Sequence, residues 1–302
     1  MVIPLFGART LPRQYAASAV LCGAASAHPF HRSLAGVAIG RGDTIHLLGD
    51  DEVRVFGQGG EFVRAWPAPS GAACLATGAD GRVFVGSIGR IDIFDAGGRP
   101  AGGFDAINNG QPAAITSIKV FRQEIFAGDA VARCIHRYDS AGRRLGEIGN
   151  RDKTRGFMLP NKWLDFAVDT AGVIHATDTG RHRVSRWAID GSPLGAFGAF
   201  GQIHPSDFVG CCNPVNLALT PDGKVVTGEK MIARVKVYEP DGTLLALIDA
   251  SHFDPANVHL PIAIDSTGRI LVADPVRRVV KIFSLTGRTN AQGADRGDGG
   301  AA

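Results

Sequence analysis

The sequence has little of what marks helical, membrane-spanning or nucleic-acid-binding proteins. Aromatic residues make up 7% of the 302 residues, charged residues 20%, and the formal net charge is only +3. No run of lysine or arginine forms a basic stripe and no aromatic platform is visible, which argues against nucleic-acid binding. Stretches with a helical hydrophobic period are nearly absent, and no apolar run is long enough to span a membrane. We therefore expect one soluble body that is not built on helices.

Glycine, in contrast, is abundant, with 40 residues. Many of these glycines end tight turns between two short apolar runs, as at 79–81, 169–172, 221–223 and 265–268. Asp-Gly and other Gly-ended turns of this kind join the two strands of a β-hairpin. The chain is therefore predicted to be a series of antiparallel hairpins.

One unit of three apolar runs occurs six times. A small-residue run and a turn are followed by a second run that ends in an acid, and then by an arginine and a third run that closes on an aromatic residue. The closing aromatics are Phe56, Phe94, Tyr138, Trp187, Tyr238 and Phe283, so the unit recurs every 38 to 51 residues. This period is typical of one four-stranded propeller blade. The sequence thus predicts an all-β fold, a six-bladed β-propeller.

The last unit lacks the fourth apolar run that follows each of the other five. Those five runs are 61–66, 99–104, 144–149, 193–197 and 243–248. An incomplete last blade would leave an unpaired strand edge and an open ring. The segment 15–23 is the natural donor of the missing strand, because the chain after it leads directly into the first inner strand at 34–39. We predict that this N-terminal strand completes the last blade and closes the ring.

This arrangement divides the chain into an N-terminal extension at 1–13, the propeller at 14–287 and a disordered tail at 288–302. A second interpretation makes residues 1–27 a secretory signal peptide, with Arg9 and Arg13 before a small-residue stretch and a cleavage site at 25–27. Because that stretch contains only Val20 and Leu21 as strong hydrophobes, we favour the ring-closing strand and a cytoplasmic protein. Export to the periplasm is the alternative.

The run Asp178-Thr179-Gly180-Arg181-His182-Arg183-Val184 resembles the signature of NHL repeats, a family of six-bladed propellers. Members typically read Asp-Thr-Gly-Asn-His-Arg-Val at this turn, so Arg181 replaces an asparagine. The resemblance extends loosely over 14–287 and implies the fold more firmly than an activity, since such propellers include scaffolds, binding modules and a few enzymes.

The looser copies of this signature keep its acid and its later arginine. The pairs are Asp50 with Arg54, Asp129 with Arg133, Glu229 with Arg234, and Asp274 with Arg278, whereas the second unit has Ser87 in place of the acid. Both residues lie near the turn between the second and third strands. We expect them to form ion pairs that hold a blade's turn or its neighbour in place, a structural role.

Of the five cysteines, Cys22, Cys74 and Cys134 lie in apolar runs and are predicted to be small buried hydrophobes. Cys211 and Cys212 differ, because they lie in the motif Gly210-Cys211-Cys212-Asn213-Pro214 at the end of the longest connector between units. In a propeller this connector reaches the mouth of the central channel. His204 and Asp207 belong to the same connector, so a thiol, an imidazole and a carboxylate come from one segment.

Four interpretations of this loop stay open. Adjacent cysteines could form a strained, easily reduced disulfide, because their Cα atoms are only about 3.8 Å apart. They could bind zinc or copper together with His259 and His31. A thiolate activated by His204 could act as a nucleophile. The loop could also be a structural turn at the channel mouth.

Glu229 and Lys230 replace the Asp-Thr pair of the signature in the fifth unit and are further candidates for ligand binding. Taken together, these features favour a monomeric, non-enzymatic NHL-like propeller whose channel mouth binds a protein or a small molecule. The alternative is a metal- or thiol-dependent enzyme or redox protein that uses Cys211 and Cys212. A calcium-dependent lactonase is disfavoured, because the loops at the axis offer few acids.

Overall fold

The computed structural model describes residues 11–23, 26–149 and 156–286. The predicted tail at 288–302 and most of the predicted extension at 1–13 lie outside these residues. Within the described ranges, no helix is long and apolar enough to cross a membrane.

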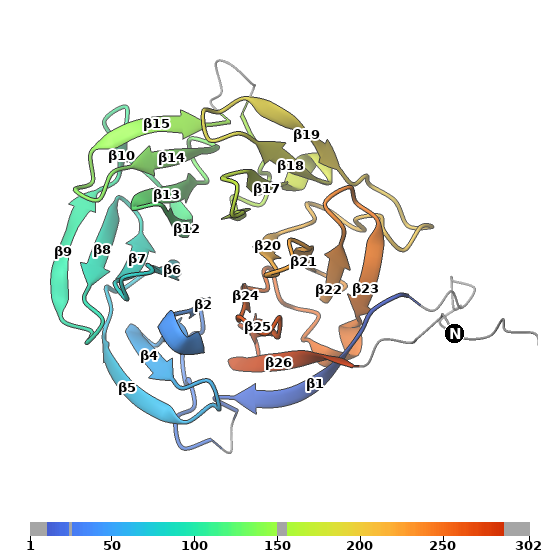
Figure 1. The fold of residues 1–302 in the computed structure, drawn as a ribbon, viewed down its shortest axis with the longest axis horizontal. Coiled ribbons are helices and arrows are strands. Elements are labelled where there is room, and N and C mark those ends of the chain that lie inside the picture. The colour runs from blue at the N-terminus through green and yellow to red at the C-terminus, as the bar shows by residue number, and fades with distance from the viewer. Residues whose placement is uncertain (1–10, 24–25, 150–155, 287–302) are drawn as a thin grey trace, which may run out of the picture.

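Six antiparallel sheets of four strands each are arranged around a central axis, so the structure confirms the six-bladed propeller (Figure 1). From the innermost strand outward, blades 1 to 3 consist of β2 (Gly36–Ile39), β3 (Ile45–Gly49), β4 (Glu52–Phe56) and β5 (Phe62–Pro67); β6 (Cys74–Thr77), β7 (Val83–Ser87), β8 (Arg90–Phe94) and β9 (Pro100–Asp105); and β12 (Ile115–Phe121), β13 (Glu124–Asp129), β14 (Cys134–Tyr138) and β15 (Arg144–Ile148).

Blades 4 to 6 consist of β16 (Phe166–Val168), β17 (Ile174–Asp178), β18 (Arg183–Trp187) and β19 (Pro193–Phe197); β20 (Asn216–Leu219), β21 (Val225–Glu229), β22 (Arg234–Tyr238) and β23 (Leu244–Ile248); and β24 (Ile262–Ile264), β25 (Ile270–Asp274), β26 (Val279–Thr286) and β1 (Gln14–Leu21). A small hairpin of β10 (Ile107–Asn108) and β11 (Gln111–Pro112) lies in the connector between blades 2 and 3, and short 3-10 turns occur at η1 (Arg41–Asp43), η2 (Thr179–Arg181) and η3 (Ala250–His252).

The N-terminal strand β1 completes blade 6, as predicted. It pairs antiparallel with β26 from Gln14 opposite Thr286 to Leu21 opposite Val280, and the two strands run side by side at the rim of the ring (Figure 1). Leu21 and the following Cys22 are buried in the core between blades 6 and 1. The segment that could have been a signal peptide is thus part of the last sheet.

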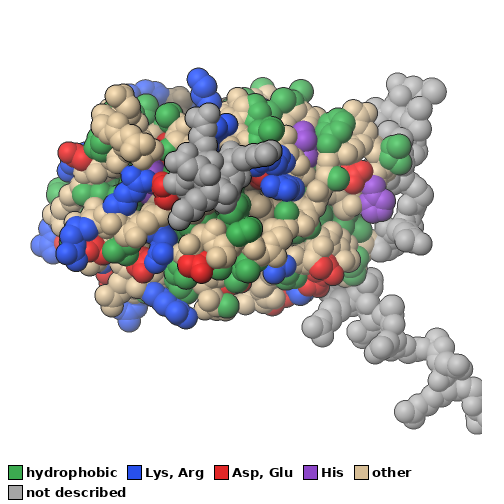
Figure 2. All heavy atoms as spheres, turned by 90° about the horizontal axis from the view of Figure 1, so that it is seen from above, with side chains coloured by type: hydrophobic (Ala, Val, Ile, Leu, Met, Phe, Trp, Pro, Cys, Tyr) green, Lys and Arg blue, Asp and Glu red, His purple; other side chains and the backbone are tan. Residues whose placement is uncertain are grey.

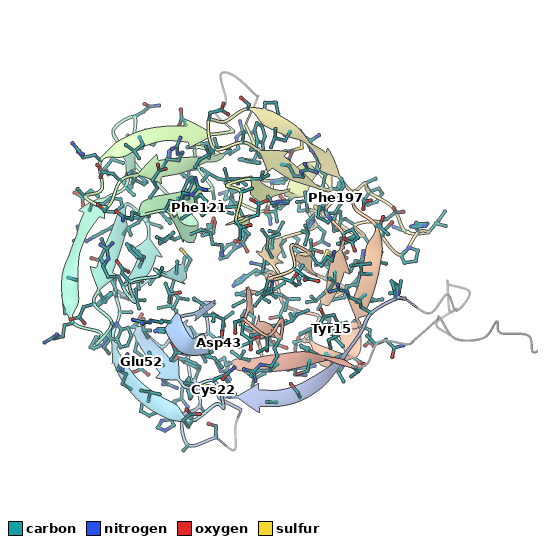
Figure 3. All side chains as sticks on the ribbon, viewed as in Figure 1. Tyr15, Cys22, Asp43, Glu52, Phe121 and Phe197 are labelled. Atoms are coloured by element: carbon teal, nitrogen blue, oxygen red, sulfur yellow. The ribbon has the colours of Figure 1, made fainter. Side chains whose placement is uncertain are left out.

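The hydrophobic core is divided into six clusters, one between each pair of neighbouring blades. The aromatic residues predicted to close the third strands do so and enter these clusters: five are the last residues of β4, β8, β14, β18 and β22, and Phe283 lies in β26. Side chains fill the spaces between the blades, whereas the axis is more open (Figure 3). Packing between the facing sheets of neighbouring blades therefore holds the ring together.

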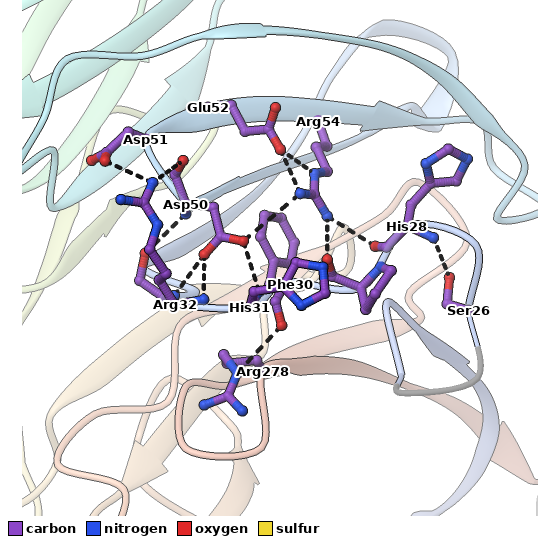
Figure 4. Close-up of polar contacts among 12 residues, drawn as sticks. Ser26, His28, Phe30, His31, Arg32, Asp50, Asp51, Glu52, Arg54 and Arg278 are labelled. Atoms are coloured by element: carbon purple, nitrogen blue, oxygen red, sulfur yellow. Dashed lines mark hydrogen bonds and ion pairs between the residues drawn. The ribbon is translucent and has the colours of Figure 1, made fainter.

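The acids at the ends of the second strands hold the connectors that lead into their own blades. In blade 1, Asp50 accepts hydrogen bonds from the backbone N–H groups of His31, Arg32 and Ser33, and Arg54 approaches it at 3.8 Å (Figure 4). The equivalent carboxylates accept an N–H from Ala114, Met158, Val209 and Asp254 in blades 3 to 6. The acids therefore have the structural role predicted for them.

Two of the predicted acid–arginine pairs are wrong in detail. In blade 3, the carboxylate of Asp129 contacts His136 at 3.0 Å instead of Arg133. In blade 6, Arg277 is the ion-pairing neighbour of Asp274 at 3.8 Å, while Arg278 donates to the carbonyl oxygen of Phe30. The turns place these arginines differently, so the same sequence spacing leads to different partners.

Seen edge-on, the disc shows lysine and arginine side chains interspersed with aspartate, glutamate and apolar groups (Figure 2). No single-sign stripe is visible on this face. This mixed distribution agrees with the low net charge of the chain, and the face shown has no basic surface that would bind nucleic-acid phosphates.

Candidate functional site

The innermost strands of the six blades line a channel along the axis of the ring. Their register puts one equivalent residue of each blade at the same level, because each of these residues faces the second-strand residue that follows the partner of the blade's closing aromatic. Five of the six residues at this level are alanine: Ala38, Ala76, Ala167, Ala218 and Ala263. The sixth, in blade 3, is Lys119, which pairs with Phe126.

Lys119 is therefore a cation in a ring of methyl groups. It is half-buried, and among the described residues its ammonium group has neither an ion pair nor a hydrogen bond. The nearby carboxylate of Asp165 is engaged elsewhere, because it accepts from the amide of Asn216 at 3.0 Å and from the backbone of Leu217 at 3.1 Å. A half-buried ammonium without a partner is costly unless water or a ligand compensates it.

The channel is wider at one end than at the other. At the level where the connectors reach the inner strands, a cavity of about 30 Å³ is lined by Cys74, Ser117, Lys119, Asp165 and Asn216 among others. Toward the opposite ends of the same strands, a cavity of about 250 Å³ is lined mainly by aliphatic side chains, together with Thr77 and with Lys119 as its one charged residue. The larger space for an amphipathic ligand is therefore at the end of the channel away from the connectors.

Trp163 and His259 stack on each other at the narrow end, with ring centroids 4.5 Å apart and an interplanar angle of 15°. Trp163 lines the small cavity, and its indole N–H is buried without a hydrogen-bond partner in the described structure. Burial lowers the pKa of His259 to about 4. The imidazole is therefore neutral at physiological pH and acts as an aromatic surface.

The predicted cysteine loop lies in the connector from blade 4 to blade 5. The Sγ atoms of Cys211 and Cys212 are 2.9 Å apart; Cys211 is exposed and Cys212 is buried. Burial, followed by the hydrogen bond with Cys211, raises the pKa of Cys212 to about 11. The Cys212 thiol is thus protonated at neutral pH and is a poor nucleophile.

Asn213 and Glu229 hold this connector in place. The Asn213 amide is buried and bonds the backbone of Val209 and Lys230. Glu229 is fully buried and forms ion pairs with Lys236 at 2.7 Å and with Arg234 at 3.0 Å. Burial lowers the pKa of Lys236 to about 8, against the attraction of the Glu229 carboxylate. Glu229, a predicted ligand residue, is occupied with structural contacts.

His204 and Asp207 are placed apart from the thiol chemistry predicted for them. The His204 imidazole contacts the Ser206 hydroxyl at 2.6 Å, and Asp207 accepts from the backbone of His204 at 3.3 Å. The carbonyl oxygen of Asp207 accepts from Lys236. Both side chains thus stabilise their own turn.

The residues predicted to share a metal ion are not gathered at one point. His259 stacks on Trp163, and the backbone of His31 is bound to Asp50 in another connector. In the part of the chain that the structure describes, the one group of three potential ligand atoms within 4.8 Å of one another is Cys134, His136 and Glu147. The structure does not bring Cys211, Cys212, His259 and His31 together into such a group.

The sequence interpretation missed Lys119. Alignment of the units on their closing aromatics does not reveal it, because Lys119 stands 19 residues before its aromatic and the five alanines stand 18 or 20 residues before theirs; the strand register puts the six at one level. Cys134, Cys74 and Cys22 are buried as predicted. The contact of Cys134 with His136 was readable, since residues two apart on a strand share a face.

The fold has many solved relatives, although no protein-family model matches the chain. Virginiamycin B lyase from Staphylococcus aureus is similar with a TM-score of 0.58 and 12% sequence identity, covering 90% of this chain and 100% of the lyase chain. A streptogramin B lyase has a TM-score of 0.57 and 13% identity over 84% of this chain and 79% of its own. A chain of the mitotic checkpoint complex has a TM-score of 0.60 and 12% identity over 95% of this chain and 97% of its own. At these identities the chain is shown to share the propeller fold.

Proposed function

We propose that this propeller is a binding protein, and that it takes up a small amphipathic carboxylate in its axial channel. The observation that carries the proposal is Lys119, the one cation in a ring position that the other blades fill with alanine. A carboxylate would supply the missing partner of the ammonium through a charge-assisted hydrogen bond. The apolar body of the ligand would pack on the aliphatic walls of the wide cavity.

The size of the wide cavity, about 250 Å³, favours a short aliphatic chain. Isothermal titration calorimetry with hexanoate tests this directly. We expect the wild-type protein to bind hexanoate, and Lys119→Met to weaken binding by roughly 10- to 100-fold, the usual worth of a hydrogen bond to a charged group. Because methionine removes an uncompensated cation, the variant should be at least as stable as the wild type.

Two controls separate the channel from the connector face. Lys230→Met, next to the cysteine loop, should bind hexanoate like the wild type, and the neutral ligand hexanamide should bind the wild type weakly. The proposal fails if hexanoate does not bind, or if Lys119→Met binds it as tightly as the wild-type protein does.

A second candidate function is redox sensing by Cys211 and Cys212, favoured by their 2.9 Å sulfur separation and the exposure of Cys211. An oxidant such as a disulfide would accept two electrons and two protons while one S–S bond forms between the neighbours. The product would be strained and easily reduced. A thiol count that falls by two in wild-type protein, but not in a Cys211→Ser, Cys212→Ser variant, would support it; an unchanged count under mild oxidant would exclude it.

A further inference from the structure

The outer half of blade 3 contains a cluster of three potential metal ligands that has no counterpart among the described residues of the other blades. Cys134 and His136 lie two residues apart on β14, and Glu147 of β15 pairs directly opposite His136. Cys134 and His136 are buried, and Glu147 is partly exposed. The site lies far from the channel in the blade and takes no part in the binding proposed above.

We infer that Cys134, His136 and Glu147 form a zinc site. The Cys134 Sγ lies 3.7 Å from Nδ1 of His136 and 3.5 Å from Oε2 of Glu147, and the latter two atoms are 3.8 Å apart. In a tetrahedral site with ordinary zinc–ligand bonds, these separations would be about 3.6, 3.6 and 3.4 Å. The three atoms already lie close to the corners that such a site requires, with a fourth position left for water.

The chemistry of the donors also suits zinc. A thiolate, an imidazole and a carboxylate together favour a borderline-soft ion, whereas calcium and magnesium prefer oxygen ligands alone. Zinc would release the thiol proton of Cys134 to solvent. Burial and the nearby Glu147 carboxylate raise the pKa of this thiol. The positive charge of a bound metal ion would stabilise the thiolate form.

His136 is oriented as a zinc-binding histidine would be. Its Nε2 lies 3.0 Å from the buried carboxylate of Asp129, which can only accept, so Nε2 carries the proton and Nδ1 presents its lone pair to the cluster. Asp129 is itself fixed by the N–H groups of Val131 and Ala132. In zinc sites the ligating histidine commonly donates its other ring N–H to a carboxylate, which fixes the orientation of the ring.

Comparison with the other blades shows that this cluster is not a repeated structural device. At the position of His136, blades 1, 5 and 6 carry Arg54, Lys236 and Lys281, each of which donates to a carbonyl oxygen of its connector. In blade 3 an imidazole takes this position, and its Nδ1 faces a thiol and a carboxylate.

Arg144 currently supplies the positive charge of the cluster. One of its guanidinium nitrogens lies 3.0 Å from Nδ1 of His136 and 2.5 Å from Oε2 of Glu147. A zinc ion would displace this nitrogen, and the contact of Arg144 with Asn108 of β10 at 3.0 Å gives the side chain an alternative partner. Arg144 and zinc therefore compete for the same two ligand atoms.

The test is a zinc titration of chelator-treated full-length protein against a chromophoric competitor. We expect one zinc ion per chain in the wild type, in Cys74→Ser and in the Cys211→Ser, Cys212→Ser variant. Asp129→Asn should weaken binding by about 10- to 100-fold, Cys134→Ser by more, and Arg144→Gln should tighten it by about tenfold, because a competing charge-assisted hydrogen bond is removed.

Several results would overturn the zinc site. These are no stoichiometric zinc in the wild type, equal affinity in Cys134→Ser, or loss of zinc only when Cys211 and Cys212 are replaced. If Cys134→Ser does not fold, the wild type with Co²⁺ and Arg144→Gln still decide. A cobalt complex without a thiolate charge-transfer band, or no tightening in Arg144→Gln, would each contradict the inference.

Discussion

Single residues that depart from the six-fold repeat carry the chemistry proposed for this protein. Lys119 stands where the other five blades have an alanine at the channel wall, and His136 stands where three of the other blades have a connector-binding cation. Both lie in blade 3, which keeps the four-stranded pairing of the other blades. A repeat of this kind supplies the scaffold six times, so one unlike side chain changes the chemistry without changing the fold.

Two histidines with strongly lowered pKa values should make the protein sensitive to acid. Burial lowers the pKa of His46 and of His259 from 6.5 to about 4. Between these pH values the unfolded chain binds more protons than the folded one, so the free energy of unfolding should fall as the pH falls from about 6.5 to about 4. Urea denaturation across this range measures the slope. His259→Gln should flatten it, and equal slopes in the variant and the wild type would contradict the assignment.

Lys236 is predicted to be important for stability. Lys236→Met leaves the buried Glu229 with Arg234 as its remaining cation, and breaking a buried ion pair from one side should reduce the free energy of unfolding by about 3 kcal/mol. The matched control is Arg99→Met, because the pair of Arg99 with Asp95 is exposed and should contribute nothing measurable. Similar denaturation midpoints for the two variants would argue against the structural role of Glu229.

At the scale of strands, β1 is the element on which the ring depends. Deletion of residues 1–22 would remove the partner of β26 and the buried side chains of Leu21 and Cys22. The free energy of unfolding should fall by about 3 kcal/mol or more, as measured by chemical denaturation. Deletion of residues 1–10 keeps β1 and is the control; a shortened chain without β1 that is as stable as this control would contradict the closure.

The strands were largely predictable from the sequence, because alternation of apolar runs and turns is a local signal. The predicted run 193–197 coincides with β19, and 243–248 begins one residue before β23. The β10–β11 hairpin was missed although Asn109-Gly110, a strong hairpin signal, lies at its turn. Its two-residue strands are too short to show a periodic pattern.

At the scale of the whole molecule, the ring brings together residues that are far apart in the sequence. The cavity beside Lys119 is lined by strands from all six blades, so neither its width nor its position along the axis could be predicted from any one segment. The prediction instead placed the site at the cysteine loop, where unusual residues are adjacent in the sequence. The structure shows that loop to be held by Asn213 and Glu229 beside the narrow end of the channel.

The most direct test of the channel site is a crystal structure of the protein with hexanoate. The account predicts electron density on the axis of the ring, with the ligand carboxylate within hydrogen-bond distance of the Lys119 ammonium and the chain extending along the aliphatic wall toward the wide end. Density for hexanoate beside Cys211 and Cys212, or an empty channel at saturating ligand, would contradict it.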